Sequence, residues 1–166
     1  MALWDELTGQ ADAIAIVEAA AAASRIGGSD DSSMTHSWLI TGPPGSGRSN
    51  LAYAFATALL GGVGGGADAS SDHDESTRRQ VAARTHPDLG VLATERVIIS
   101  IEEVRQLVAT SQFSPSVGRY RVMVIEDADR MTERRSNVLL HRRQNWLPIN
   151  QSRTRDARQR VQIKLP

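Results

Sequence analysis

The chain of 166 residues has no cysteine, and its only lysine is Lys164. Without cysteine it can form neither a disulfide framework nor a cysteine-based metal site. No apolar run approaches the length that a membrane-spanning helix requires, and the first residues lack the basic start and apolar core of a signal peptide. These absences favour a cytoplasmic protein. Its hydrophobic content of 40% is ordinary for a single globular domain.

A glycine-rich stretch with the spacing of a phosphate-binding loop follows the apolar residues 38–41. It consists of Gly42, Pro43, Pro44, Gly45, Ser46, Gly47, Arg48 and Ser49. In the pattern G-x-x-x-x-G-K-[ST], glycines let backbone N–H groups curl around phosphate oxygens, and the next helix points its positive end at the same anion. Because the lysine position holds Arg48, whose planar guanidinium differs from a compact ammonium, the loop predicts nucleotide binding and weighs against catalysis. The alternative is a glycine-rich turn that binds nothing.

A second apolar segment, residues 121–125, ends in two acidic residues, Glu126 and Asp127. Carboxylates in this position, downstream of a phosphate loop, hold magnesium in nucleotide enzymes. We therefore expect Ser49 and Glu126 to bind magnesium and Asp127 to orient an attacking water. Acidic residues after a strand are also common in solvated turns, so this interpretation depends on the neighbouring loop.

Apolar periodicity and turn residues predict helices and strands that alternate along the chain. Ser100 and Glu103 have the spacing of a capping box at the start of a helix. The expected elements are a helix over 8–25, a strand over 37–41, a helix over 49–60, a short helix near 78–83, strands over 89–93 and 97–99, a helix from 101, a strand over 121–125 and a helix from 132. This alternation predicts a three-layer α/β domain with a parallel sheet, in which ligands bind beyond the carboxyl ends of the strands.

Several segments come in the order seen in a known family. They are residues 3–10 (LWDELTGQ), the loop 42–49, residues 86–88 (HPD), residues 124–129 (VIEDAD) and residues 137–140 (NVLL). In these segments the chain resembles bacterial clamp-loader AAA+ subunits, in particular the delta prime type of DNA polymerase III in its actinobacterial form. The resemblance covers residues 1–140 and rests on several ordered motifs.

This resemblance implies a P-loop AAA+ nucleotide-binding domain over 1–140. It also implies a place in DNA replication, in a ring with the delta and gamma/tau subunits that loads the sliding clamp on primer–template DNA. Delta prime subunits tend to be weak or inactive ATPases that act as a structural stator. Arg48 and the reversed order of Glu126 and Asp127 agree with ATP and magnesium being bound without appreciable hydrolysis.

The chain departs from the family pattern in two regions. Residues 61–84 lack the four cysteines of the zinc module that family members usually carry, so we expect a flexible insertion and no zinc. After Leu140 the resemblance stops, and the expected fold is incomplete because the next core strand, the lid and the collar are missing. Residues 141–166 hold seven basic side chains and one acid, and we expect a disordered basic tail. It is interpreted as a truncated or frameshifted end or, alternatively, as an arm for nucleic acid.

Two other functions remain open from the residues themselves. One is a free-standing P-loop ATPase or nucleotide kinase that uses Ser49, Glu126 and magnesium, which ATP turnover would reveal. The other is a small module that binds nucleic acid through the basic tail, which salt-sensitive binding without the nucleotide domain would reveal.

Overall fold

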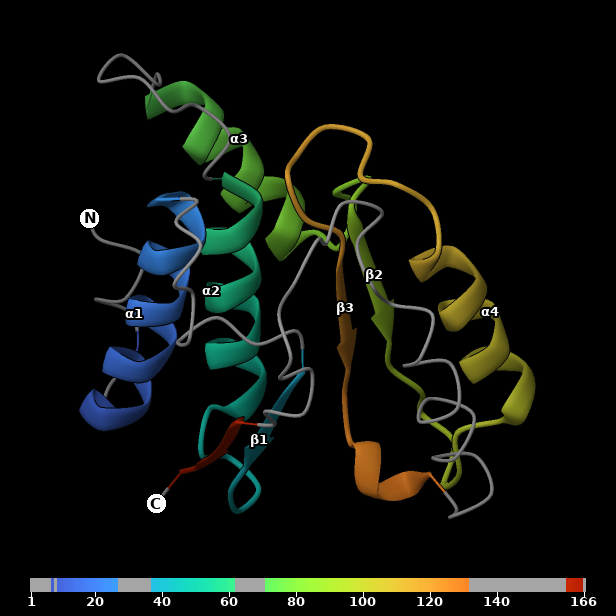
Figure 1. Ribbon diagram of the computed structural model, residues 1–166. Helices are drawn as coiled ribbons and strands as arrows, with labels where there is room; N and C mark the ends of the chain where they lie inside the picture. Colours follow the sequence, from blue (N-terminus) through green and yellow to red (C-terminus); the bar gives the residue numbers. More distant parts are fainter. Residues whose placement is uncertain (1–6, 8, 27–36, 62–70, 132–160, 166) are drawn as a thin grey trace, which may run out of the picture.

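The computed structural model describes residues 7, 9–26, 37–61, 71–131 and 161–165. Its elements, shown in Figure 1, are α1 (Ala11–Ile26), β1 (Trp38–Thr41), α2 (Arg48–Gly61), α3 (Ser71–Ala82), β2 (Leu89–Leu92), α4 (Ile101–Ser111), β3 (Val122–Ile125), the 3-10 turn η1 (Ala128–Arg130) and β4 (Val161–Lys164). Within these residues no helix is both long and apolar enough to cross a membrane.

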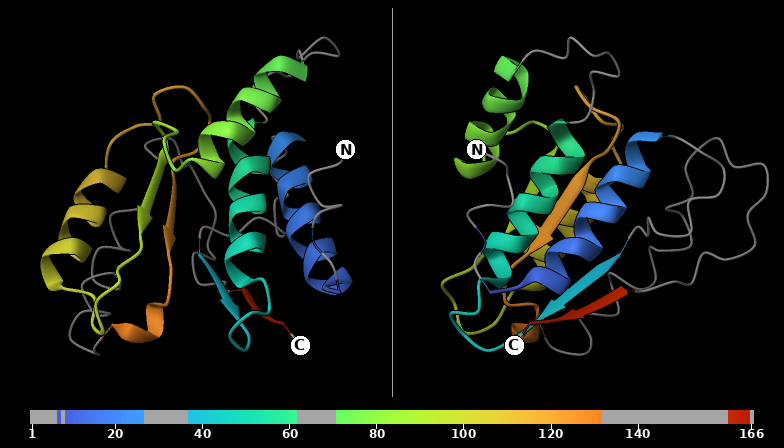
Figure 2. Two further views of the ribbon diagram at one scale, coloured as in Figure 1. Left: turned by 180° about the vertical axis from the view of Figure 1, so that it is seen from behind. Right: turned by 90° about the vertical axis from the view of Figure 1, so that its left-hand side faces the viewer.

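The strands form two parallel pairs. In one, β2 lies beside β3 with Leu89 opposite Val122, and in the other β1 lies beside β4 with Trp38 opposite Val161. Figure 2 shows β4 on the side of β1 that faces away from β3. The mixed helix and parallel-strand architecture confirms the predicted α/β class. The described residues form two separate two-stranded sheets rather than one continuous sheet, so the complete three-layer arrangement stays a prediction.

The β2–β3 pair is covered by a helix on each face. Val122 and Val124 pack with the side of α2 that carries Ala56 and Leu60. Met123 and Ile125 pack with α4, which buries Val104, Leu107 and Val108. Successive side chains of a strand point to opposite faces, so the apolar run 122–125 lets one strand contact both helices.

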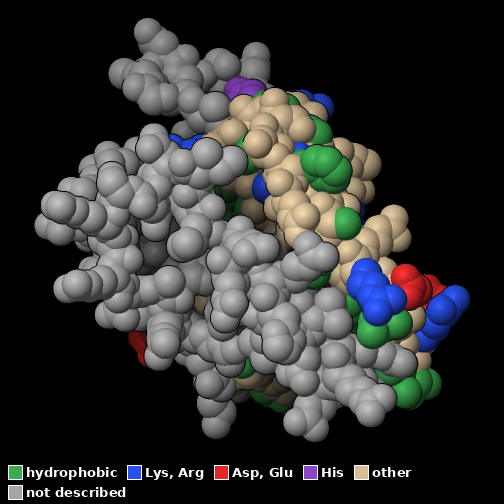
Figure 3. Space-filling view, turned by 45° about the vertical axis from the view of Figure 1, so that its right-hand side comes forward, with side chains coloured by type: hydrophobic (Ala, Val, Ile, Leu, Met, Phe, Trp, Pro, Cys, Tyr) green, Lys and Arg blue, Asp and Glu red, His purple; other side chains and the backbone are tan. Residues whose placement is uncertain are grey.

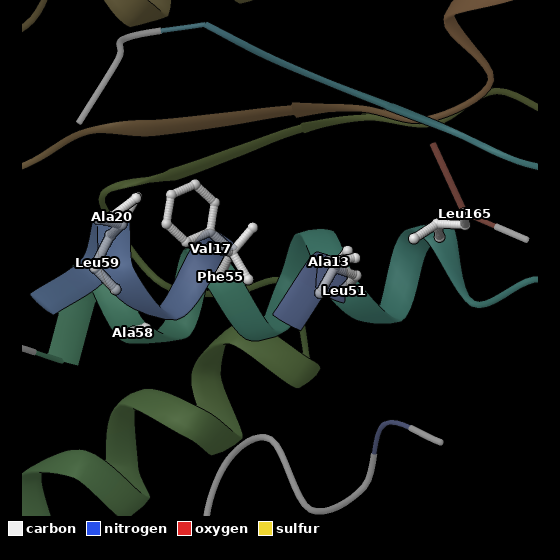
Figure 4. Close-up of a cluster of buried hydrophobic side chains, with 9 residues drawn as sticks. Ala13, Val17, Ala20, Leu51, Phe55, Ala58, Leu59 and Leu165 are labelled. Carbon is white, nitrogen blue, oxygen red and sulfur yellow. The ribbon is translucent and has the colours of Figure 1, made fainter. Parts of the chain in front are cut away.

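A second cluster joins α1 to α2 and reaches the phosphate loop. Val17 of α1 packs against Leu51 and Phe55 of α2, and Leu165 completes the cluster beside the start of α2 (Figure 4). The ring of Trp38 meets that of Phe55 edge to face, with centroids 5.0 Å apart. Burial of this apolar surface holds β1 and the first turn of α2 together, and these are the two ends of the loop.

The predicted capping box at the start of α4 is confirmed. The Ser100 hydroxyl accepts a hydrogen bond from the Glu103 N–H at 3.2 Å, and the Ser100 N–H donates to the Glu103 carboxylate at 2.7 Å. This reciprocal pair satisfies two N–H groups at the helix start. Val104, Leu107 and Val108 of the same helix are buried.

The prediction of a strand over 97–99 is wrong. Val97 is 84% exposed, whereas Ile99 is fully buried in the cluster beneath α4. The residues follow β2 without pairing to any strand in the described part of the chain. A run of three apolar residues is too short for periodicity to decide between a strand and an anchored loop.

The expectation of disorder over 141–166 is wrong for its last part, because residues 161–164 form β4 and Leu165 is buried. The signal was present, since Val161, Ile163 and Leu165 alternate with polar residues as in a strand.

The insertion predicted as flexible over 61–84 contains the twelve-residue helix α3. Its acidic residues come early and its arginines late, which suits the helix dipole. The expected helix from Thr132, the expected first residue of the helix over 8–25 and residues 141–160 lie outside the described residues.

A buried carboxylate, Asp88, fastens the loop that precedes β3. It accepts hydrogen bonds from the N–H groups of Ser116, Val117 and Gly118 at 2.5 to 3.0 Å, and Arg121 lies 3.2 Å away. Burial alone would raise the pKa of Asp88, but these N–H groups and Arg121 lower it to about 2. The HPD turn therefore anchors the loop as well as leading into β2.

Replacing Asp88 with asparagine should lower the free energy of unfolding by about 2 kcal/mol at pH 7, because a charged acceptor of several hydrogen bonds is lost. The carboxylate stabilises the fold fully above its ordinary pKa of 3.8 and loses this effect as the pH falls toward 2. Urea unfolding between pH 5 and pH 2.5 should therefore show a steeper loss for the unmodified chain than for the variant. Glu95→Gln, at an exposed residue, is the control. Equal slopes for Asp88→Asn and the unmodified chain would contradict the assignment.

Candidate phosphate-binding site

The glycine-rich loop connects β1 to α2 through a tight turn. The Ser46 N–H donates to the Pro43 carbonyl at 3.2 Å, and the Leu51 N–H donates to the Gly47 carbonyl at 2.9 Å as α2 begins. Gly45 and Gly47 have φ angles of +82° and +80°, a left-handed conformation that glycine adopts without steric penalty. The loop thus returns the chain sharply from the strand into the helix.

Two side chains from distant segments support this loop. The Gln10 amide, just before α1, donates a hydrogen bond to the Ser46 carbonyl. A Cβ atom on Gly47 would lie 3.0 Å from that amide nitrogen, and one on Gly42 would lie 2.9 Å from the Cβ of Leu165. The positive φ of Gly47 and the close approach of Leu165 to Gly42 therefore favour glycine at these two positions. The loop motif contains no signal for either supporting residue.

The start of α2 provides the positive end of a helix at the loop. The first N–H groups of an α-helix have no partner within the helix, and the helix dipole favours an anion beside them. Because α2 begins at Arg48, the N–H groups of Arg48 and Ser49 belong to this first turn. The Ser46 hydroxyl oxygen is buried and finds no hydrogen-bond partner in the described part of the chain. These groups can meet phosphate oxygens.

The structure brings Ser49 and Glu126 together, although 77 positions separate them in the sequence. The Ser49 hydroxyl donates to Oε2 of Glu126 at 3.4 Å. The other carboxylate oxygen, Oε1, accepts a hydrogen bond from the Tyr53 hydroxyl at 2.5 Å and contacts Nη2 of Arg84 at 2.8 Å. Burial, followed by the hydrogen bond to Glu126 and its charge, raises the pKa of Tyr53 well above its ordinary value.

Sequence reasoning missed both Tyr53 and Arg84. Tyr53 follows Ser49 by four positions and so lies on the same face of α2, which is a signal that could have found it. Arg84 comes after α3 in a stretch without a motif, and only the folded chain shows that it reaches Glu126.

Asp127, expected to orient water, is paired with two arginines. Its carboxylate lies 3.7 Å from Nη2 of Arg48 and 3.3 Å from Nη2 of Arg130. The backbone of Asp127 is left-handed, with φ +48°. Arg48, which occupies the lysine position of the loop, therefore contacts Asp127, which was expected to orient water.

The donor set around the loop does not suit magnesium. Magnesium prefers oxygen ligands that bring negative charge, whereas Arg84 already compensates Glu126, and Arg48 and Arg130 compensate Asp127. Three guanidinium groups against two carboxylates leave these five side chains with a net charge of +1. Nor does the described part of the chain contain a cluster of three or more His, Asp or Glu residues that could hold a metal. The net positive charge of the five side chains around the loop therefore favours an anion over a cation.

An open hollow of about 710 Å³ lies beside the loop. Gln10 and Leu165 each line this hollow and also support the loop. Its volume is in the range of small-molecule sites, and its walls are mostly apolar. The lining residues are Leu7, Gly9, Gln10, Ala11, Asp12, Ala13, Ile14 and Leu165.

A strand, a glycine-rich loop and a helix whose start lies near acidic residues at the end of a second parallel strand are typical of phosphate-binding α/β domains. Comparison with known families identifies the class to which this domain belongs. Residues 27–142 match the family described as "DNA polymerase III, delta subunit", and the chain belongs to this family.

A particular relative agrees with this assignment. The chain is 33% identical over 107 residues to DNA polymerase III subunit delta' of Pseudomonas aeruginosa. This aligned segment covers 63% of the chain and 32% of the relative. The chain thus spans about a third of the relative's length. Together the two comparisons confirm the predicted resemblance to the delta prime type.

Replacing Gly47 with valine should abolish the thermal stabilisation of the protein by ATP. A side chain at this position would collide with Gln10 and occupy a backbone conformation that valine avoids, so the loop could not close on phosphates. Stabilisation by a ligand scales with its concentration over Kd, and melting curves with increasing ATP measure it. Gln106→Val is the control, because Gln106 is an exposed residue of α4 that belongs to neither the loop nor the hollow. Equal ATP responses in the two variants would remove the loop from the site.

Proposed function

We propose that this chain is a delta prime-type subunit of the DNA polymerase III clamp loader. It serves DNA replication as part of the ring that loads the sliding clamp on primer–template DNA. Its nucleotide domain is of the AAA+ P-loop class and works as a stator with bound ATP. Membership of the family and the likeness to subunit delta' support the first part of this proposal.

The observation that carries the stator role is the contact between Arg48 and Asp127. In an active site, the cation of the loop steadies the transferring phosphate and the carboxylate orients water. Here these two groups are paired with each other, and Arg130 holds the carboxylate from the other side. This pairing supports a loop that binds ATP without hydrolysing it.

The shape of the site supports a nucleotide as the ligand. The loop and the start of α2 present N–H groups suited to phosphates, and the apolar hollow next to them has room for a base and sugar. Leu165 and Gln10 connect the two regions. One ligand with a charged end and a flat apolar end would contact both.

Charges of both signs lie on the described part of the face shown in Figure 3, where acidic and basic side chains are neighbours at one edge. Non-specific binding of nucleic acid depends on clusters of Lys and Arg that contact phosphates. The alternative of a module that binds nucleic acid depends on the basic residues after Leu140.

Co-expression with the delta and gamma/tau subunits of the same organism tests membership of the ring. The chain should elute with these subunits on size exclusion after nuclease treatment and a high-salt wash. Salt weakens contacts between charged surfaces, so a basic tail that merely adheres to nucleic acid would be lost in this step. An unrelated P-loop protein of similar size serves as the control. Separate elution of the chain would contradict the proposed role.

Steady-state phosphate release in ATP and magnesium should be undetectable for the purified chain. Phosphoryl transfer depends on positioned charges, and mispairing of Arg48 with Asp127 removes two of them together. The double variant Arg48→Lys, Asp127→Glu restores the residue types of an active site and is measured beside it. Turnover of about one per second by the unmodified chain, the low end for phosphoryl-transfer enzymes, would overturn the stator role and favour a free-standing ATPase.

A further inference from the structure

Arg84 makes contacts that neither the loop motif nor the proposed function explains. Its guanidinium lies 2.8 Å from Oε1 of Glu126 and 5.4 Å from the centre of the Tyr53 ring. The Tyr53 hydroxyl donates to the same carboxylate oxygen. A cation over an aromatic face is attracted by the ring as well as by the acid, so two different groups hold Arg84 beside Glu126.

The backbone of Arg84 is left-handed, with φ +57°, because this residue caps the C-terminal end of α3. Its N–H donates to the Val81 carbonyl at 3.0 Å and the Thr85 N–H donates to the Gln80 carbonyl at 2.8 Å, the pattern of a helix C-terminal cap. The cap fixes the point from which the Arg84 side chain extends to Glu126.

The position of Glu126 creates an electrostatic problem for phosphate binding. Its carboxylate lies 3.4 Å from the Ser49 hydroxyl, at the start of the helix where phosphates would bind. Two negative groups this close repel each other unless a cation lies between or beside them. A divalent cation would solve the problem, but the charge of Glu126 is already compensated by Arg84.

We propose that Arg84 takes the place of a divalent cation as the counter-charge of Glu126, so that the loop binds the polyphosphate of a metal-free nucleotide. The proposal rests on the proposed nucleotide binding and names the form of the ligand. The alternative is that Arg84 and Glu126 form a merely structural ion pair. Exposed pairs contribute little to stability, and loss of such a pair would not change how ATP binding depends on magnesium.

Calorimetric titration of ATP in EDTA and in excess magnesium distinguishes these possibilities. The unmodified chain should bind ATP with Kd values that agree within about threefold in the two buffers, because its counter-charge is built in. Arg84→Gln leaves the Glu126 carboxylate uncompensated. This variant should bind about tenfold more weakly in EDTA and recover most of the loss in magnesium.

Two further variants make the test specific. The double variant Arg84→Gln, Glu126→Gln removes the acid together with its counter-charge and should regain metal-independent binding. Arg105→Gln is the matched control, because Arg105 is an exposed arginine that pairs with Glu102 on α4. It should behave like the unmodified chain. Melting temperatures without nucleotide show whether each variant is folded.

Each outcome has a defined meaning. Binding by the unmodified chain only in magnesium would overturn this inference and leave the proposed nucleotide binding intact. Equal weakening of Arg84→Gln in both buffers would also overturn it and favour the structural ion pair. Absence of ATP binding in either buffer would overturn both this inference and the proposed nucleotide binding.

Discussion

The central constraint in this molecule is the packing of α2 on both of its long sides. Leu51 and Phe55 contact α1, while Ala56 and Leu60 contact β2 and β3. A helix that is apolar around most of its surface must be buried, and α2 has neighbours on each side that allow this. Because its first residue ends the glycine-rich loop, the same packing that forms the core also sets the direction in which the loop presents its N–H groups.

The second organising feature is the pairing of Glu126 and Asp127 with arginines. Glu126 and Asp127 follow β3 directly, where open α/β sheets place their ligand-binding groups. In this chain Arg84, Arg48 and Arg130 contact these carboxylates. The acidic motif therefore serves as an internal partner for cations of the protein.

The sequence predicted those parts of the fold that depend on neighbouring residues. The loop, the helices around it and the Ser100 capping box need only local spacing, and the helix at 101 was found where its cap places it. Interactions across the chain were not predictable in this way. Arg84 contacts Glu126, and Gln10 contacts Ser46, because elements far apart in sequence pack together. A short sequence pattern does not predict such long-range contacts.

The strand over 161–164 was missed for a related reason. Its alternation of Val161, Gln162, Ile163 and Lys164 fits a strand, but a four-residue signal at the end of a basic segment is weak unless a partner strand is known. β1 is that partner, and the pairing is visible only in the folded chain. The expectation of a strand over 97–99 failed because three apolar residues do not by themselves decide between a strand and a loop, and in the described part of the chain these residues are not in a strand.

Leu165, near the C-terminal end of the chain, packs directly against Gly42 at the start of the glycine-rich loop. Leu165 is buried behind the first glycine of the loop, and its N–H donates to the Thr41 carbonyl at 2.7 Å. Any displacement of segment 161–165 would therefore alter the packing of Leu165 against Gly42 in the loop. Conversely, a ligand that shifts Gly42 must move Leu165 and the strand attached to it. A spectroscopic label near β4 would thus report on a loop, residues 42–49, that lies more than a hundred positions earlier in the sequence.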